Sequence, residues 1–74
     1  MKREEAVKLL EDLKANFDSI ESTIYVMLKK EKGSWELQIK WTPTPDEMRR
    51  LKNQAAEKGI KVTFDDDLTK FSKS

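Results

Sequence analysis

The stretch WELQIKWTPTPDEMRR, residues 35–50, decides how this chain folds, because it contains a strand, a stop and a helix start in direct succession. Apolar side chains occupy every second position from Trp35 to Trp41, and polar side chains occupy the positions between them. This alternation predicts a strand with one buried face and one face in water. Pro43 ends the strand and keeps the preceding residue extended.

The following residues are typical of a helix N-terminus. Thr44 is a favoured N-cap, and Pro45 sits at the first helical position, where its missing N–H costs nothing. Glu47 completes a capping box with Thr44. We therefore interpret the two prolines as a helix entry and not as a proline-recognition motif, which requires an exposed, extended segment. Gly59 is expected to end this helix in the left-handed conformation.

Three further segments complete the core elements. An apolar stripe from Ala6 to Phe17 predicts an N-terminal helix. The run Ile24–Leu28 is apolar on both faces, which favours a central strand shielded by neighbours on both sides. It is joined to the strand at residues 35–41 by a short hairpin connection containing Gly33. The alternating segment IKVTF, residues 60–64, predicts the third strand.

The C-terminal segment DDDLTKFSKS, residues 65–74, allows two interpretations. Asp65–Asp67 could form the turn of a second hairpin, with Leu68–Ser72 returning as a short edge strand. Alternatively, the tail lays Leu68 and Phe71 on the core and frays. We favour the edge strand.

Together these elements predict a single domain, residues 1–74, of the α+β class. The expected order is α-β-β-α-β, with a short final strand as an option, arranged as a two-layer sandwich. If the apolar Ile24–Leu28 strand is central, the mostly antiparallel sheet has the order 2-1-3, with a split β-α-β crossover. Both helices then cover one face of the sheet, and the other face meets water.

Composition excludes several classes of function. The 74 residues include no cysteine and no histidine, so the commonest general base, thiol nucleophile and metal ligands are absent. The net charge of +1 gives no overall attraction to nucleic acid or anionic membranes. No apolar run is long enough to span a membrane, and the charged N-terminus is unlike a signal peptide. We expect a soluble, cytoplasmic protein that is not an enzyme and needs no cofactor.

The open face of the predicted sheet is the candidate interaction surface. Tyr25 and Met27 form its apolar part, and Lys29, Lys40 and Lys61 surround them. Such a patch could serve a weak homodimer or a protein partner. A sheet with an aromatic and basic rim could also bind RNA or single-stranded DNA, but one tyrosine is fewer than such domains usually present.

The acidic run Asp65–Asp67 raises the question of a divalent cation site. Calcium needs roughly six or more oxygen ligands placed around the ion. Three adjacent carboxylates on alternating faces of the chain do not supply that arrangement, so we interpret the run as an acidic turn.

The chain as a whole resembles a computationally designed, idealised α/β protein in the split β-α-β or ferredoxin-like style. The resemblance rests on the capped helix TPDE, the glycine-terminated helix running into a strand in EKGIKVTF, the short glycine hairpin and the surface of Glu, Lys and Arg. It implies a monomer in which each local feature agrees with the fold, and in which no site or partner is required.

Overall fold

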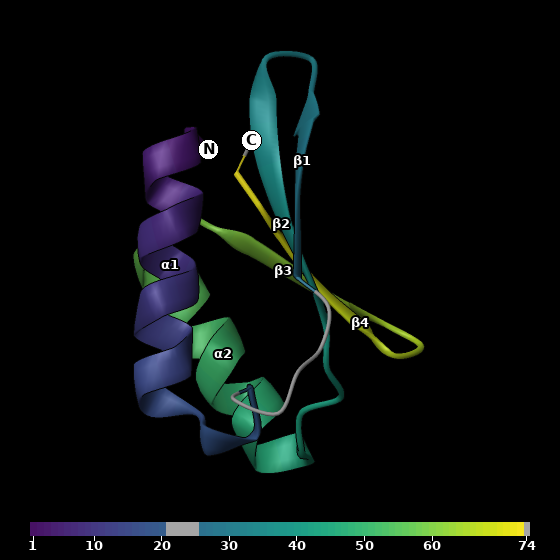
Figure 1. Ribbon diagram of the computed structural model, residues 1–74. Coiled ribbons are helices and arrows are strands. Elements are labelled where there is room, and N and C mark those ends of the chain that lie inside the picture. Colours follow the sequence, from purple (N-terminus) through teal and green to yellow (C-terminus); the bar gives the residue numbers. More distant parts are fainter. Residues whose placement is uncertain (21–25, 74) are drawn as a thin grey trace.

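The chain forms two successive α-β-β units in the computed structural model, which describes residues 1–20 and 26–73 (Figure 1). The elements are α1 (Arg3–Asn16), a short 3-10 helix (Asp18–Ile20), β1 (Val26–Glu31), β2 (Ser34–Lys40), α2 (Pro45–Glu57), β3 (Lys61–Asp65) and β4 (Leu68–Ser72). The two helices lie on the same side of one sheet, so the predicted α+β, two-layer architecture is confirmed.

The sheet has four strands in the order β1-β2-β4-β3, and each neighbouring pair is antiparallel. The optional final strand is therefore present. It lies in the middle of the sheet and not at its edge, since β4 pairs with β2 on one side and with β3 on the other.

The predicted strand order 2-1-3 is wrong. The strand expected at the centre, β1, has β2 as its one neighbour among the described strands and forms an edge of the sheet. Of the apolar run that suggested a central position, Ile24 and Tyr25 lie outside the described residues, and only Val26–Leu28 belongs to β1. Shielding of both faces can come from long neighbouring side chains as well as from flanking strands, so an apolar run does not fix a strand's position.

A split crossover exists, but it encloses a different strand. Since β2 and β3 are each antiparallel to β4, they are parallel to one another, and α2 connects them. The prediction placed β1 between the crossing strands, whereas β4 fills that position. The third strand accordingly pairs with β4 and not with the first.

The core lies between the sheet and the two helices. Leu37 and Ile39 of β2 and Phe71 of β4 are buried on the helix-facing side. The predicted inward face of residues 35–41 is thereby confirmed, with Trp35 half-buried at its end. The helices contribute small and branched side chains to the same cluster: Ala6, Leu9 and Leu13 from α1, and Leu51 from α2.

The predicted start of α2 is confirmed in detail. The hydroxyl oxygen of Thr44 accepts a hydrogen bond from the backbone N–H of Glu47 at 3.2 Å. In return, the Glu47 carboxylate accepts the Thr44 backbone N–H at 2.9 Å. Gly59 follows the helix with φ +70°, as expected for its left-handed role.

We expect Thr44→Ala to lower the free energy of unfolding by about 1 kcal/mol, because the Glu47 N–H then loses its protein acceptor. The urea midpoint would measure the loss. Thr44→Ser should retain most of the stability, and Thr42→Ala, two residues before the N-cap, should change little. An unchanged midpoint in Thr44→Ala would show that the cap does not contribute to stability.

Candidate functional site

The open face of the sheet carries the residues that sequence patterns singled out. Strand register places Met27, Gln38, Lys70 and Thr63 in one row across this face. Tyr25 lies outside the described residues, and the structure describes only the backbone of Met27. Of the apolar part of the predicted patch, Met27 alone is therefore located, by register, on edge strand β1.

The three predicted lysines share the open face but do not gather. Lys29 lies on edge strand β1 and Lys61 on the opposite edge strand β3. Three strand spacings separate these edges, which amounts to about 14 Å. Lys40 is exposed near the other end of β2. The predicted basic rim is therefore dispersed over the sheet.

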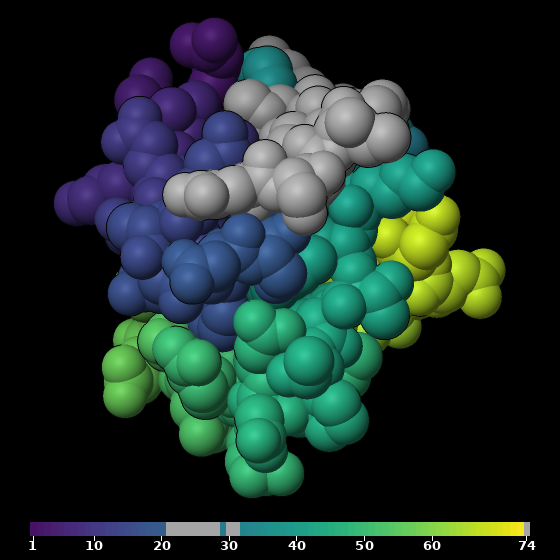
Figure 2. All heavy atoms as spheres, turned by 60° about the horizontal axis from the view of Figure 1, so that its bottom comes forward, coloured from purple at the N-terminus to yellow at the C-terminus, as the bar shows by residue number. Residues whose placement is uncertain are grey.

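Ion pairs and polar contacts further divide this face. The Lys70 ammonium lies 3.3 Å from an Asp65 carboxylate oxygen, and the Lys40 ammonium lies 3.8 Å from that of Asp67. Each pair lies at the surface and belongs to or borders the β3–β4 turn. The C-terminal part of the chain, yellow in Figure 2, projects on the side away from the purple N-terminal helix. The acidic run thus neutralises neighbouring lysines, as an acidic turn would. No group of three potential metal-ligating side chains gathers anywhere in the described part of the chain.

Among the described residues of this face, Gln38 is the one that neighbouring side chains nearly cover. It is 8% exposed although no helix lies over it. Its amide nitrogen donates to the Glu36 carboxylate at 3.4 Å. The middle of the open face is therefore a polar contact between side chains and not an apolar platform for stacked bases.

A hollow lies between the two helices, at a place that the sequence did not indicate. It measures about 220 Å³, and its apolar walls include Leu13, Leu51 and Phe71. A shallower hollow of about 500 Å³ continues it toward Ile60. The ion pair between Lys58 and Asp12, at 3.7 Å, borders both. Helix spacing on the sheet, which depends on tertiary packing, creates this hollow, so no local pattern could have predicted it.

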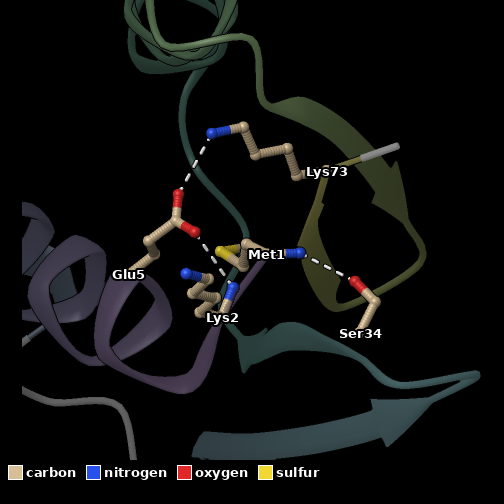
Figure 3. Close-up of polar contacts among 5 residues, drawn as sticks. All are labelled: Met1, Lys2, Glu5, Ser34 and Lys73. Carbon is tan, nitrogen blue, oxygen red and sulfur yellow. Dashed lines mark hydrogen bonds and ion pairs between the residues drawn. The ribbon is translucent and has the colours of Figure 1, made fainter.

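A polar cluster at the start of α1 was also missed (Figure 3). The Glu5 carboxylate accepts the backbone N–H of Lys2 and the ammonium of Lys73, each at 3.1 Å. The Met1 amino group donates to the Ser34 hydroxyl at 2.7 Å, and the Met1 carbonyl accepts the Trp35 N–H. The cluster joins α1 to the β1–β2 hairpin and to the residue after β4. The signal available in the sequence was a glutamate at the third helical position.

These contacts hold the pKa of the Glu5 carboxyl below its ordinary value of 4.5. The main cause is the hydrogen bond from the Lys2 backbone, and the second is the hydrogen bond from Lys73. Both favour the ionised form. What the cluster can do chemically is to anchor a helix end, because its carboxylate is already engaged by two donors.

A second cluster packs around Trp41 at the other end of the sheet. Its ring lies 5.5 Å from that of Phe17, centroid to centroid, and the Arg50 guanidinium stacks over Phe17 at 4.7 Å. The indole N–H donates to the Ser19 hydroxyl at 2.8 Å. Trp41 and Phe17 are both buried. These aromatic rings therefore stabilise the joint between the helices and β2 and are closed to a ligand.

No protein-family model, curated protein sequence or solved structure matches the chain. No helix in residues 1–20 and 26–73 combines the length and apolar character that crossing a membrane requires.

We expect Glu5→Gln to destabilise the protein at neutral pH and to have less effect in acid. Because the folded-state pKa is depressed, ionised Glu5 contributes stability above pH 4.5, and this contribution is lost as the pH falls through the folded-state pKa. Urea midpoints of the wild type and Glu5→Gln at pH 7 and pH 3 would test this. Glu4→Gln is the matched control. An equal difference between wild type and Glu5→Gln at both pH values would contradict the assignment.

Proposed function

We propose that this chain is a small folded domain with no chemical activity of its own. The observation that carries the proposal is the use of its charged side chains. The ion pairs of the described residues lie at the surface, and all but Arg49–Asp46 within α2 link separate segments of the chain, as Lys58 and Asp12 link the helices. Catalytic sites instead gather titratable groups in a cleft, where burial and neighbouring charges tune them.

A designed or structural origin is part of this proposal. It is supported by the α2 capping box, by the glycine after α2 and by two-residue hairpin turns. Lys32 and Asp66 depart from an idealised pattern, since both adopt positive φ, at 52° and 49°. An idealised two-residue turn would place asparagine, aspartate or glycine at such a position, so Lys32 is the clearer departure.

Thermal unfolding with a ligand panel tests the absence of a site. We expect no change in Tm with Mg²⁺, Ca²⁺, Zn²⁺, ATP or single-stranded RNA at 0.15 M salt. A ligand at one hundred times its Kd adds about 2.7 kcal/mol, which raises the Tm of so small a domain by roughly 10–20 °C. The proposal would be overturned if any member of the panel raised the Tm by that amount and if the rise disappeared when a lysine or a carboxylate residue in the inter-helix hollow or on the open face was replaced.

We further propose that the architecture is a circular permutation of the ferredoxin-like β-α-β-β-α-β arrangement. Two features support this relation. The β2-α2-β3 crossover encloses β4, and the chain ends lie close together, where Lys73 contacts Glu5 at 3.1 Å (Figure 1). Joining the ends and opening the turn at Asp66–Asp67 gives the order β4-α1-β1-β2-α2-β3, which is β-α-β-β-α-β.

Such a permutant, made with a short Gly/Ser linker, should fold with the same strand register and unfold cooperatively, because neighbouring termini allow permutation at exposed turns. NMR contacts between Leu37 and Phe71 would report the register. A control opened between Leu9 and Leu10, in the middle of α1, should fail to fold. If the permutant opened at Asp66–Asp67 does not fold, the proposed relation is contradicted.

A protein contact on the open face is the second candidate function. The half-buried Leu68 lies on this face beside Lys40 and adds apolar surface to the row next to Met27. It ranks second because the ion pairs Lys40–Asp67 and Lys70–Asp65 flank that surface. A homodimer formed there would appear in sedimentation at two concentrations and would be weakened by Leu68→Lys.

A further inference from the structure

The outer side of β1 borders no other described strand. Its partner β2 lies on one side only. The connecting turn consists of Lys32 and Gly33, both with positive φ (52° and 79°), which is the turn type that suits a two-residue hairpin. Backbone hydrogen-bonding groups of an edge strand are available to an added strand.

The turn also determines which residues face outward. In a two-residue hairpin the flanking residues, Glu31 and Ser34, form a hydrogen-bonded pair. Hydrogen-bonded and non-hydrogen-bonded pairs then alternate along the ladder. Lys29 and Met27 accordingly direct their backbone groups toward β2. Residues 26, 28 and 30 direct theirs outward, and we name them the outward set.

Charge distinguishes this edge from the opposite one. Residues 26–32 contain three lysines and one glutamate, and Lys29 and Lys32 are exposed. Residues 61–66, on the β3 edge, contain one lysine and two aspartates. Near the β1–β2 turn, Arg3 adds a further cation, with its guanidinium 5.9 Å from the centre of the Trp35 ring. The β1 edge is therefore more basic than the β3 edge, where Lys52 lies 5.8 Å from the centre of the Phe64 ring and offsets one of the two aspartates.

We propose that the β1 edge binds an extended, acidic peptide segment of a partner protein by β-strand addition. The outward set supplies the main-chain hydrogen bonds, and the exposed Lys29 and Lys32 select acidic side chains. This surface shares Lys29 with the open face, but its main-chain groups lie along the outer border of β1, and it requires no chemical activity of the domain. Its success or failure is therefore independent of the proposed function.

A titration with a defined peptide tests the proposal. The probe is an octapeptide of alternating glutamate and threonine, capped at both ends, added to isotope-labelled protein and followed by NMR. We expect amide exchange to slow at Val26, Leu28 and Lys30 and to remain unchanged on β3. A lysine–threonine peptide of equal length is the control and should not bind. Equal binding of both peptides, or shifts confined to β3 or the open face, would overturn the proposal.

Two substitutions at one position separate strand pairing from charge. Lys30→Thr and Lys30→Pro both remove the lysine charge, but only proline removes the outward N–H, and an edge strand tolerates proline where that N–H faces solvent. Because one hydrogen bond to the peptide is lost, we expect Lys30→Pro to bind about tenfold more weakly than Lys30→Thr. Both variants should keep the wild-type Tm to within a few degrees.

Three results count against the proposal. Equal affinities of the two variants would show that charge alone attracts the peptide. A large fall in Tm for Lys30→Pro alone would show that this N–H points toward β2 and that the outward set is misassigned. Pairing of β1 edges between two copies, seen as dimers by light scattering without peptide, would make the occupant a second copy of this chain.

Discussion

The pairing of β2 with β4 is the interaction on which the rest of the structure depends. These strands join the two α-β-β units, and within residues 1–20 and 26–73 no other strand pairing connects them. Leu37 lies opposite Phe71 and Ile39 opposite Thr69 at the bottom of the core. The fully buried Thr69 hydroxyl donates to the Trp41 carbonyl at 2.9 Å, which satisfies a polar group where water cannot reach. The packing of the helices, the position of the inter-helix hollow and the identity of the two edge strands all depend on this pairing of β2 with β4.

Local features were predictable from sequence because their causes are local. The Thr44–Glu47 cap, the helix ends and the inward face of residues 35–41 depend on contacts over a few residues. Strand order depends on long-range pairing, which those patterns do not contain. The central strand β4 has the sequence LTKFS, with two apolar residues, and its Thr69 is more deeply buried than its Leu68. An apolar count therefore assigned the centre to the wrong strand.

The predicted interaction surface also combines local features that the sequence predicts with long-range features that it does not. Period-two alternation correctly placed Lys29, Lys40 and Lys61 on one face, but it could not give their separation across four strands. The ion pairs of Asp65 and Asp67 likewise required the β3–β4 turn, which brings Asp65 beside Lys70 of β4 and Asp67 beside Lys40 of β2. Correcting β1 from centre to edge moves the available backbone to its outer side. The surface of interest thus shifts from a face of the sheet to one of its borders.

The central position of β4 has a consequence for synthesis on the ribosome. Lys40 of β2 and its partner Leu68 are separated by 28 positions, and ribosomes add about 5–20 residues per second. For roughly 1.5–6 s the nascent chain therefore presents β2 with an apolar face and an unpaired inner border. That border is longer than either edge of the finished sheet. The period between the emergence of β2 and of β4 is when neighbouring nascent chains can pair wrongly, and it is when a chaperone has most to protect.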